Sequence, residues 1–598
     1  MRRAQLNLRR AVAVLAVVGC AAAVAAGTEA TAAPSAPVTG QPVVLPTGQK
    51  LGLEWTGGRP RIIHPAGETT PMTVTYQAGH LYAVPWDAMP YLDAGIDRSM
   101  FDVTELAAQE GRHGTGRIPV SLTVSGDTTV PGVAITSRSG SRAHGYIADP
   151  AAFGAALRDR LGADPTGARR AGTPVPGLTR LALDTPAPTQ ARPAFVMETL
   201  TVKLTPPTGR NLLGALVQVT NTDDSRKYDA FTTFGADDYI KISVPQGHYA
   251  VVADATTGNS DGTDIVDYVP IVADYSVTTN NQSVTLDSDR ATAAASYTTP
   301  SPATLNLVGL DIEPTDGVHD FDSPGISFGY AAENQVLVQP TPRPEYGSLK
   351  LDTDEFLTGD GFDYRLTAEW IDGIPASLHR DVRQGDLARV DDRVYGGGDA
   401  IAYDRGPVYP DLRGVIVGGP NTKATTHTDY LYGPSEVRWI SSVYRSTGSS
   451  AENMFSVPVG YPSGGTYGVD WFRPSLGSGF SAAPPFPRPY CVACRTAGTM
   501  TLSLASELDS DPAHNGAVGG DATGYERLRV SQDGTGVADV ADTDGATFAV
   551  PAAAHTYRIE DTLDRAKLGF TTLETDAGQL GDRPEPLPMF LPLGSLVR

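Results

Sequence analysis

Three stretches of the chain share one alternating pattern of apolar and polar positions. Each has two apolar residues at alternate positions, a proline directly after them, and then a tyrosine followed two positions later by another apolar residue. The stretches are Ile242-x-Val244-Pro245 with Tyr249-x-Val251, Phe455-x-Val457-Pro458 with Tyr467-x-Val469, and Phe548-x-Val550-Pro551 with Tyr557-x-Ile559. Period-two alternation places apolar side chains on one face of a strand, and proline belongs where a strand leaves its ladder. We therefore expect a hairpin that closes a small β-sandwich, repeated three times.

Similar alternating runs, bounded by glycine and proline, cover most of the chain and predict a mainly β, multi-domain protein. The expected build is several immunoglobulin-like or transthyretin-like β-sandwiches, with one small α/β segment near the N-terminus. The predicted divisions are a signal peptide over 1–32, an N-terminal β-rich domain over 40–125, the small α/β segment over 130–185, a linker over 186–194, a β-sandwich over 195–290, a larger β domain over 300–485 and a C-terminal β-sandwich over 495–598.

Residues 149–161 carry the only clear helical pattern after the leader. Asp149 is placed to cap this helix and Pro150 fits its first position. Its apolar residues at helical spacing are Phe153, Leu157 and Leu161. Two shorter helices are expected upstream, one capped by Asp87 and ending near Gly95, the other beginning around Asp97.

Length, composition and charge indicate the number of domains, the class of fold and the kinds of partner that the protein can bind. The chain has 598 residues, more than one hydrophobic core usually spans, so several domains are expected. Glycine (64) and proline (47) are abundant, yet apolar residues make up 40%, which fits turn-rich β domains rather than disorder. The net charge of −22 predicts an acidic surface that repels nucleic acids and anionic lipids.

The N-terminus has the pattern of a secretory leader. Four arginines precede an apolar run over 11–27, and the Ala-Thr-Ala site at 30–32 predicts a mature chain that begins near Ala33. An alternative is the lipobox-like sequence at 17–20, in which Cys20 would carry a lipid anchor. No later apolar run approaches the ~20 residues of a membrane-spanning helix. We therefore expect a secreted, extracellular protein without a transmembrane segment.

Cys491 and Cys494 are the only cysteines after the leader. They follow a proline-rich loop and lack the βαβ surroundings of a redox motif. A zinc site would need two further ligands, and no second cysteine pair is present. A small disulfide loop between the two is the expected state in an oxidising compartment, and no cofactor is expected.

The stretch from Tyr82 to Leu106 carries a recognisable set of motifs. It contains Val-Pro-Trp-Asp-Ala at 84–88, then Ile-Asp-Arg at 96–98 and Phe-Asp-Val-Thr at 101–104. This stretch resembles the N-terminal region of large secreted subtilisin-like serine peptidases of actinobacteria. Residues 153–161 and 177–184 are similar to the segment that leads into the catalytic domain of that family, and parts of 200–249 and 508–557 are similar to its C-terminal β domains.

The chain differs from this family in the region where the peptidases have their catalytic domain. In the peptidases that domain lies between the two matching regions, whereas here only the linker at 186–194 separates them. A subtilisin-like site needs Asp, His and Ser in fixed surroundings. The nearest sequences, around Asp93, His113 and Met500, lack those surroundings, and Met500 stands where the nucleophile should be. The resemblance therefore implies a protein without the protease activity.

Other chemical signals have simpler structural interpretations. Two G-x-S-x-G matches, at Ser260 and Ser327, lack the strand–turn–helix context of a nucleophile elbow and are interpreted as turns. Two acidic clusters could bind calcium, but Asp, Asn and Gly at such spacing are also ordinary turn residues. The clusters are Asp509, Asp511 and Asn515, and Asp254, Asp261 and Asp264.

These observations predict a non-catalytic extracellular binding or interaction protein. The resemblance suggests docking onto a secreted protease, because the matching N-terminal region precedes the protease in the family. The alternatives are a secreted hydrolase with an unrecognised active site and a cell-wall protein that binds a glycan. Tryptophans could line a binding face, although in β domains they more often lie in the core. They are Trp55, Trp86, Trp370, Trp439 and Trp471.

Overall fold

The structure is a computed structural model. It describes residues 41–56, 59–64, 70, 72–77, 80–92, 95–113, 117–126, 128–163, 175–184, 196–234, 238–259, 264–318, 326–330, 336–410, 416–417, 422–448, 450–474, 476–479, 493–496, 498–519, 523–543, 545–551, 553, 555–570 and 575–576. All of these belong to one unit, Val38–Arg598. The predicted signal peptide, Cys20 and the linker at 186–194 lie outside the described residues.

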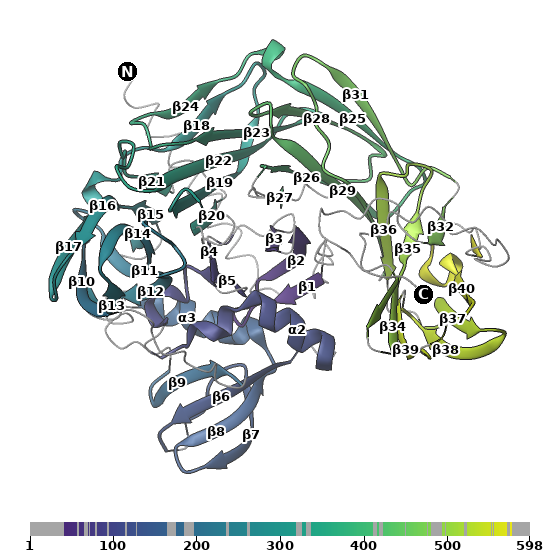
Figure 1. The fold of residues 1–598 in the computed structure, drawn as a ribbon, viewed down its shortest axis with the longest axis horizontal. Helices are drawn as coiled ribbons and strands as arrows, with labels where there is room; N and C mark the ends of the chain where they lie inside the picture. The colour runs from purple at the N-terminus through teal and green to yellow at the C-terminus, as the bar shows by residue number, and fades with distance from the viewer. Residues whose placement is uncertain are drawn as a thin grey trace, which may run out of the picture. The chain divides into compact units, whose positions relative to one another are not determined.

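Two long sheets contain about half of the described strands (Figure 1). The ten-stranded sheet contains, in spatial order, β1 (Gln41–Val44), β2 (Lys50–Thr56), β3 (Arg59–His64), β27 (Ile416–Val417), β26 (Ala400–Val408), β29 (Arg438–Thr447), β30 (Ser450–Ser456), β36 (His514–Gly519), β35 (Ala505–Leu508) and β32 (Gly477–Gly479). The nine-stranded sheet contains β31 (Thr466–Trp471), β25 (Ala388–Val394), β28 (Thr426–Tyr432), β23 (Asp363–Trp370), β22 (Ser348–Thr358), β19 (Thr304–Thr315), β20 (Ile326–Tyr330), β4 (Met72–Gln77) and β5 (His80–Pro85).

Both long sheets join segments that the sequence assigned to different units. In the ten-stranded sheet, Ile63 of β3 pairs with Ile416 of β27. In the nine-stranded sheet, Thr75 of β4 pairs with Ile326 of β20. Strands from the first 40 described residues are therefore ladder partners of strands more than 200 positions later, and the boundaries drawn from the sequence stay predictions.

Residues 197–287 form a β-sandwich. Its smaller sheet contains β13 (Tyr239–Pro245), β10 (Met197–Thr205) and β17 (Gln282–Asp287). Its larger sheet contains β12 (Asp229–Phe234), β11 (Asn211–Asn221), β14 (Gly247–Gly258), β15 (Ile265–Val269) and β16 (Ile271–Val277), and extends to β21 (Val336–Val338). Alternate residues of both sheets, such as Val202, Val244 and Val251, meet in one buried core.

Smaller sheets account for the other described strands. Near the C-terminus, one contains β33 (Ala493–Thr496), β34 (Thr499–Ser503) and β39 (Gly545–Ala549), and another contains β38 (Thr535–Ala541), β37 (Glu526–Gln532), β40 (Tyr557–Leu563) and β41 (Thr575–Asp576). A two-stranded sheet pairs β18 (Ala295–Thr298) with β24 (Leu378–Asp381). The N-terminal four-stranded sheet has the order β7 (Val133–Ser139), β8 (Arg142–Ile147), β6 (Ile118–Val124) and β9 (Leu178–Leu183).

The predicted fold class is confirmed. The protein is mainly β, with several packed sheets, and the four-stranded sheet with helix α3 (Pro150–Ala163) is the small α/β segment near the N-terminus (Figure 1). Phe153 and Leu157 of α3 share a buried core with Val120 of β6 and Leu181 of β9. This core continues into β1, β2 and β5, so the segment packs directly against strands of both long sheets.

The prediction of three hairpins is wrong. In each motif the strand before the proline and the strand after it belong to different sheets: β13 and β14, β30 and β31, and β39 and β40. The chain therefore crosses from one sheet to another at the proline, as in a β-arch. Proline ends the first ladder because it has no N–H group, and in the first and third motifs the two alternating strands then face each other across a core instead of pairing. In the second motif the opposite face of β30 is the buried one, with Met454 in the core and Phe455 half-buried.

The helix predictions had mixed outcomes. Asp149 accepts a hydrogen bond from the Ala152 amide at 2.9 Å, as an N-cap of α3 should. Asp97 caps a short 3-10 helix, η3 (Arg98–Phe101). The view of α3 as the only clear helix is wrong, because α2 (Val103–His113) follows η3 and starts with the Glu105 amide bonded to Asp102.

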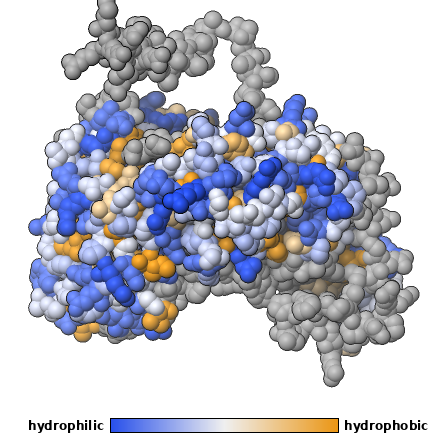
Figure 2. Space-filling view, turned by 90° about the horizontal axis from the view of Figure 1, so that it is seen from above, coloured by the Kyte–Doolittle hydropathy of each residue, from blue (hydrophilic) through white to orange (hydrophobic). Residues whose placement is uncertain are grey.

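The coloured part of the face drawn in Figure 2 is largely hydrophilic. Figure 2 shows a face on which apolar residues are scattered in small groups among hydrophilic ones. Among the residues that the structure describes, the exposed large apolar side chains are Ile135, Val196, Tyr239, Val318 and Ile371. Of the helices in the described part of the chain, none has the length and apolar character needed to cross a membrane.

Candidate ligand-binding site

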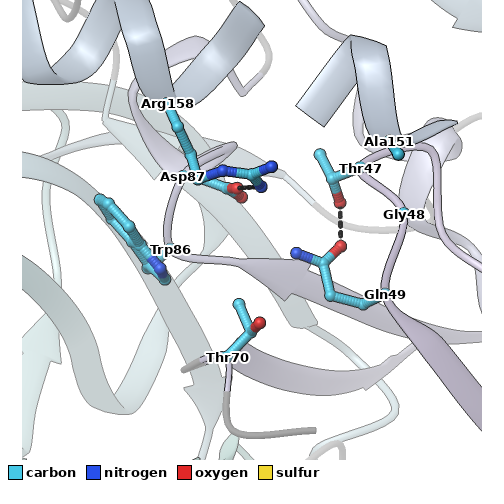
Figure 3. A pocket seen from close by; sticks show the side chains of 8 residues that line it. All are labelled: Thr47, Gly48, Gln49, Thr70, Trp86, Asp87, Ala151 and Arg158. Atoms are coloured by element: carbon cyan, nitrogen blue, oxygen red, sulfur yellow. Dashed lines mark hydrogen bonds and ion pairs between the residues drawn. The ribbon is translucent and has the colours of Figure 1, made fainter. Parts of the chain in front are cut away.

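A cavity of about 370 Å³ lies where four segments from the N-terminal part of the chain meet. These segments are the β1–β2 turn, the residue Thr70 before β4, the residues directly after β5, and helix α3. The lining residues are Thr47, Gly48, Gln49, Thr70, Trp86, Asp87, Ala151 and Arg158 (Figure 3). One aromatic ring, two oppositely charged groups and several uncharged polar groups thus surround one space, which we name the Trp86 pocket.

The β1–β2 turn forms one wall of the Trp86 pocket. Two backbone hydrogen bonds close it, from the Leu45 amide to the Gln49 carbonyl and from the Gly48 amide to the Leu45 carbonyl, both at 2.9 Å. Gly48 has a φ of +97°, which L side chains rarely adopt. A Cβ atom at Gly154 of α3 would lie 2.2 Å from the Thr47 carbonyl oxygen. Helix and turn therefore meet backbone to backbone, which fixes the width of the pocket at this wall.

An ion pair between Asp87 and Arg158 forms the wall next to α3. The Nη1 atom of Arg158 lies 2.9 Å from Oδ2 of Asp87. The carboxylate is fully buried, whereas 44% of the Arg158 side chain is exposed. The pair brings a positive group from α3 onto a buried negative group. The wall is therefore polar but has no net charge.

Trp86 and Gln49 line the pocket between these walls. The indole is half-buried and packs against the main N-terminal core. The Thr47 hydroxyl donates a hydrogen bond to the Gln49 side-chain oxygen, which fixes the carboxamide with its nitrogen toward the pocket (Figure 3). The pocket thus combines an aromatic surface with planar polar groups held in place by neighbours, a typical composition of small-ligand sites.

The sequence placed two of these residues differently. Asp87 was expected to cap a helix, but the N-cap of the following 3-10 helix, η2 (Met89–Tyr91), is Ala88, which makes no side-chain cap bond. The prediction fails because the Asp87 carboxylate turns inward to Arg158 instead. Trp86 was expected in the core, and the structure places it half in the core and half in the pocket wall. An aromatic and an acidic residue side by side directly after a predicted strand, Trp86 and Asp87, were the sequence signal that could have pointed to this pocket.

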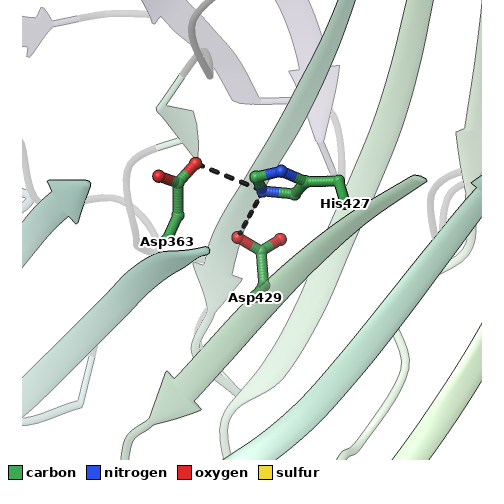
Figure 4. Close-up of side chains that lie close together, drawn as sticks. All are labelled: Asp363, His427 and Asp429. Carbon is green, nitrogen blue, oxygen red and sulfur yellow. Dashed lines mark hydrogen bonds and ion pairs between the residues drawn. The ribbon is translucent and has the colours of Figure 1, made fainter. Parts of the chain in front are cut away.

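A second cluster of chemically capable groups lies in the nine-stranded sheet. His427 and Asp429 of β28 and Asp363 of β23 meet with their ligand atoms within 4.8 Å of one another (Figure 4). Nε2 of His427 lies 3.2 Å from Asp363 Oδ2 and 3.3 Å from Asp429 Oδ1. One imidazole nitrogen and two carboxylates are ligand types that a divalent transition metal accepts.

Arginines already compensate the charge of this cluster. Arg405 of β26 pairs with Asp429 and also, at 3.0 Å, with Asp392. Arg365 reaches Asp429 at 3.4 Å. A divalent cation would lie against these guanidinium groups and be repelled by them. We therefore assign the cluster to the packing of the two long sheets, which Arg405 and Asp429 connect.

The surroundings also favour a proton on His427. Burial lowers the pKa of this imidazole, but the carboxylates of Asp429 and Asp363 outweigh burial and raise it to about 9. Burial alone would raise the pKa of Asp429, but Arg405, Arg365 and His427 hold it well below its usual range. The cluster therefore holds a protonated imidazole between two carboxylates at neutral pH.

The remaining predicted sites give no assembled centre among the described residues. Cys491 lies outside them, and of Cys494 only the backbone, in β33, is described, so the disulfide stays a prediction. Asp93 and Ser260 lie outside the described residues, His113 ends α2, Ser327 lies within β20, and Met500 is buried in β34.

The two acidic clusters also separate into local contacts. Asp509 accepts a hydrogen bond from the Asp511 amide and lies 2.9 Å from Nδ1 of His514, which is turn chemistry. Asp264 pairs with Arg210 at 2.9 Å on the surface, whereas Asp254 is fully buried. Asp261 lies outside the described residues.

Comparison with known proteins gives little information on identity. No family model and no curated protein matches the chain. A Bacteroides ovatus protein described as an adhesin aligns at 11% identity over 31% of this chain and 88% of its own, with a TM-score of 0.15. The pilus adhesin SpaC of Lactobacillus rhamnosus GG aligns at 10% identity over 70% and 67%, with a TM-score of 0.11. The major pilin BcpA of Bacillus cereus aligns at 9% identity over 46% and 99%, with a TM-score of 0.09. At these TM-scores the similarity supports no conclusion about fold or function.

Proposed function

We propose that this chain is an extracellular binding protein and that the Trp86 pocket holds its ligand. The observation that carries the proposal is the pocket itself, in which Trp86, Gln49 and the Asp87–Arg158 pair converge on one cavity. Its volume of about 370 Å³ lies within the range of small-ligand sites, roughly 300–1,000 Å³. The predicted leader and the acidic composition support a location outside the cell.

The proposal gives the pocket a binding role without a chemical step. Its described lining includes no serine, cysteine or histidine, the side chains that most often act as nucleophile or general base. The resemblance to peptidases without their catalytic part supports the same conclusion. A fluorophosphonate probe that labelled the protein covalently at a serine would contradict this part of the proposal.

A second candidate function is docking onto another secreted protein, such as a subtilisin-like protease. Among the described strands, β7 lies at the edge of the four-stranded sheet and pairs only with β8, and five of its seven residues are exposed. An exposed sheet edge can accept a strand from a partner. This function would appear as stoichiometric inhibition or co-purification of a subtilase from the same culture.

The experiment uses two forms of the mature chain, residues 33–598, as bait in native culture supernatant and cell-wall extract. One form is wild type and the other carries Trp86→Ala. A molecule retained by the first and lost from the second supports the Trp86 pocket as the binding site. If both forms retain the same molecules, the Trp86 pocket is not the binding site. A subtilase retained equally by wild type and Trp86→Ala would also contradict the pocket and favour binding at the edge strand β7.

A further inference from the structure

We propose that the Trp86 pocket binds one ring of a neutral saccharide, with the ring stacked on Trp86 and its hydroxyl groups bonded to Gln49 and Arg158. This inference rests on the proposed function and names the chemical class of the ligand. Three properties of the pocket lead to it: its charge, its arrangement of planar polar groups, and its aromatic wall.

The charge of the pocket argues for a neutral ligand. Asp87 and Arg158 neutralise each other at 2.9 Å, and none of the other described lining residues is charged. An anionic ligand would have to compete with the buried Asp87 carboxylate for the guanidinium. It would also approach a chain whose net charge is −22. A cationic ligand would meet Arg158, 44% of whose side chain is exposed.

The polar groups of the pocket suit adjacent hydroxyl groups. Gln49 is 5% exposed and its oxygen accepts the hydrogen bond from Thr47, so its amide nitrogen is presented as a donor in a fixed position. Arg158 contacts Asp87 through Nη1 and carries further N–H groups on the same rigid plane. The Gln49 amide and the Arg158 guanidinium, which the buried Asp87 carboxylate holds in place, can donate hydrogen bonds to neighbouring hydroxyl groups.

The aromatic wall suits the other side of a sugar ring. One part of the Trp86 indole packs on the core and the rest lines the cavity, opposite Gln49 (Figure 3). The face of an aromatic ring is electron-rich and attracts the weakly positive C–H groups of an apolar surface. A pyranose presents such C–H groups on its faces and hydroxyl groups around its rim. It therefore matches a pocket with one aromatic wall and polar groups across from it.

The test titrates the mature chain with a panel of neutral oligosaccharides, with acidic oligosaccharides, and with short peptides, monitored by tryptophan fluorescence and calorimetry. We expect saturable binding of a neutral member and none of the acidic ones. Trp86→Ala should weaken this binding at least about tenfold, and Trp86→Phe, which retains a ring, should weaken it less. Arg158→Lys keeps the charge beside Asp87 but loses the planar donors, so it should also weaken binding.

Trp370→Ala serves as the matched control, because Trp370 is likewise half-buried and lies beside an arginine, Arg380, 4.7 Å from its ring centre. It should bind as wild type does, and thermal unfolding of each variant verifies its fold. Binding of peptides or acidic glycans that depends on Trp86 would overturn the saccharide inference while leaving the proposed function intact. Two outcomes would overturn both the saccharide inference and the proposed function. One is saccharide binding that is equal in wild type and Trp86→Ala, and the other is a bait experiment in which no ligand depends on Trp86.

Discussion

The hydroxyl group of Tyr249 donates a hydrogen bond to the carbonyl oxygen of Pro245, four residues earlier, at 2.6 Å. This bond spans the point where the chain leaves the smaller sheet of the 197–287 sandwich and enters the larger one. The second motif has a similar bond, from Tyr467 to the Pro462 carbonyl at 3.0 Å. The tyrosine that the sequence pattern repeats thus closes a β-arch in both places.

Removing this hydroxyl group should destabilise the sandwich. Tyr249→Phe keeps the buried ring and deletes the donor, which leaves the Pro245 carbonyl short of a partner in the core. We expect a loss of about 1 kcal/mol in the free energy of unfolding, measured by urea denaturation. Tyr467→Phe is the matched variant at an exposed bond and should cost about half as much or less. Equal stability of Tyr249→Phe and wild type would show that the bond does not hold the arch.

The first and third arches show why the sequence predicted the buried positions but not their partners. Alternation determines which face of a strand is apolar, and Val244, Tyr249 and Val251 are indeed buried. A hairpin and an arch bury the same face, so the pattern cannot distinguish a neighbour in the same sheet from a partner in the opposite sheet. The proline signals only that a ladder ends.

The pocket was predictable only in part, for a related reason. The cap at Asp149 and the buried face of α3 follow from rules that act within one turn of helix, and the sequence predicted both. The Asp87–Arg158 pair joins residues 71 positions apart. No local rule brings these two side chains together. They form an ion pair because α3 packs against the β1–β2 turn, and this packing depends on the whole fold.

Breaking the Asp87–Arg158 pair should destabilise the N-terminal core. Arg158→Met keeps the aliphatic stem but leaves the Asp87 carboxylate buried without its cation. Because Arg158 is partly exposed, water can replace some of its effect, and we expect a loss of about 2 kcal/mol in unfolding free energy. Arg180→Met, which breaks an exposed pair with Asp97, should cost about 1 kcal/mol or less. If both variants unfolded at the same urea concentration, the buried carboxylate would not be the cause.

His427 should make stability depend on pH in the alkaline range. Its pKa is raised to about 9 in the folded chain, whereas it is about 6.5 when unfolded. The folded state therefore binds the proton more tightly, and the resulting stability is complete below pH 6.5 and is lost as pH rises through 9. The difference corresponds to about 3 kcal/mol. Urea denaturation between pH 6.5 and 9.5 measures this loss.

His427→Gln provides the control for that titration. It cannot take up a proton, so this part of the pH dependence should disappear while the response of all other groups remains. An NMR titration of the His427 ring should give a midpoint near 9 in the wild-type protein. A midpoint at or below the ordinary value of about 6.5 would contradict the predicted pairing with Asp363 and Asp429.

Asp254 and Asp267 should produce a pH dependence of the same sign at lower pH. Both carboxyl groups are buried, on paired strands β14 and β15, and Thr73 of β4 donates a hydrogen bond to Asp254. Burial raises the pKa of Asp254 to about 7, although Thr73 lowers it. Burial and the neighbouring Asp254 also raise the pKa of Asp267. Since the folded chain holds these protons more tightly than the unfolded one, stability falls as pH rises from about 4 through 7.

Asp254→Asn removes this titration without changing the shape of the side chain, and its carboxamide oxygen can still accept the bond from Thr73. At pH 8 the variant should be more stable than wild type by about 4 kcal/mol, because it avoids the free-energy cost of ionising a buried carboxyl group. At pH 4 the two proteins should unfold at similar urea concentrations, since Asp254 is then protonated in the folded state. A variant that is less stable than wild type at pH 8 would mean that the carboxylate has a compensating partner, and would contradict the predicted direction.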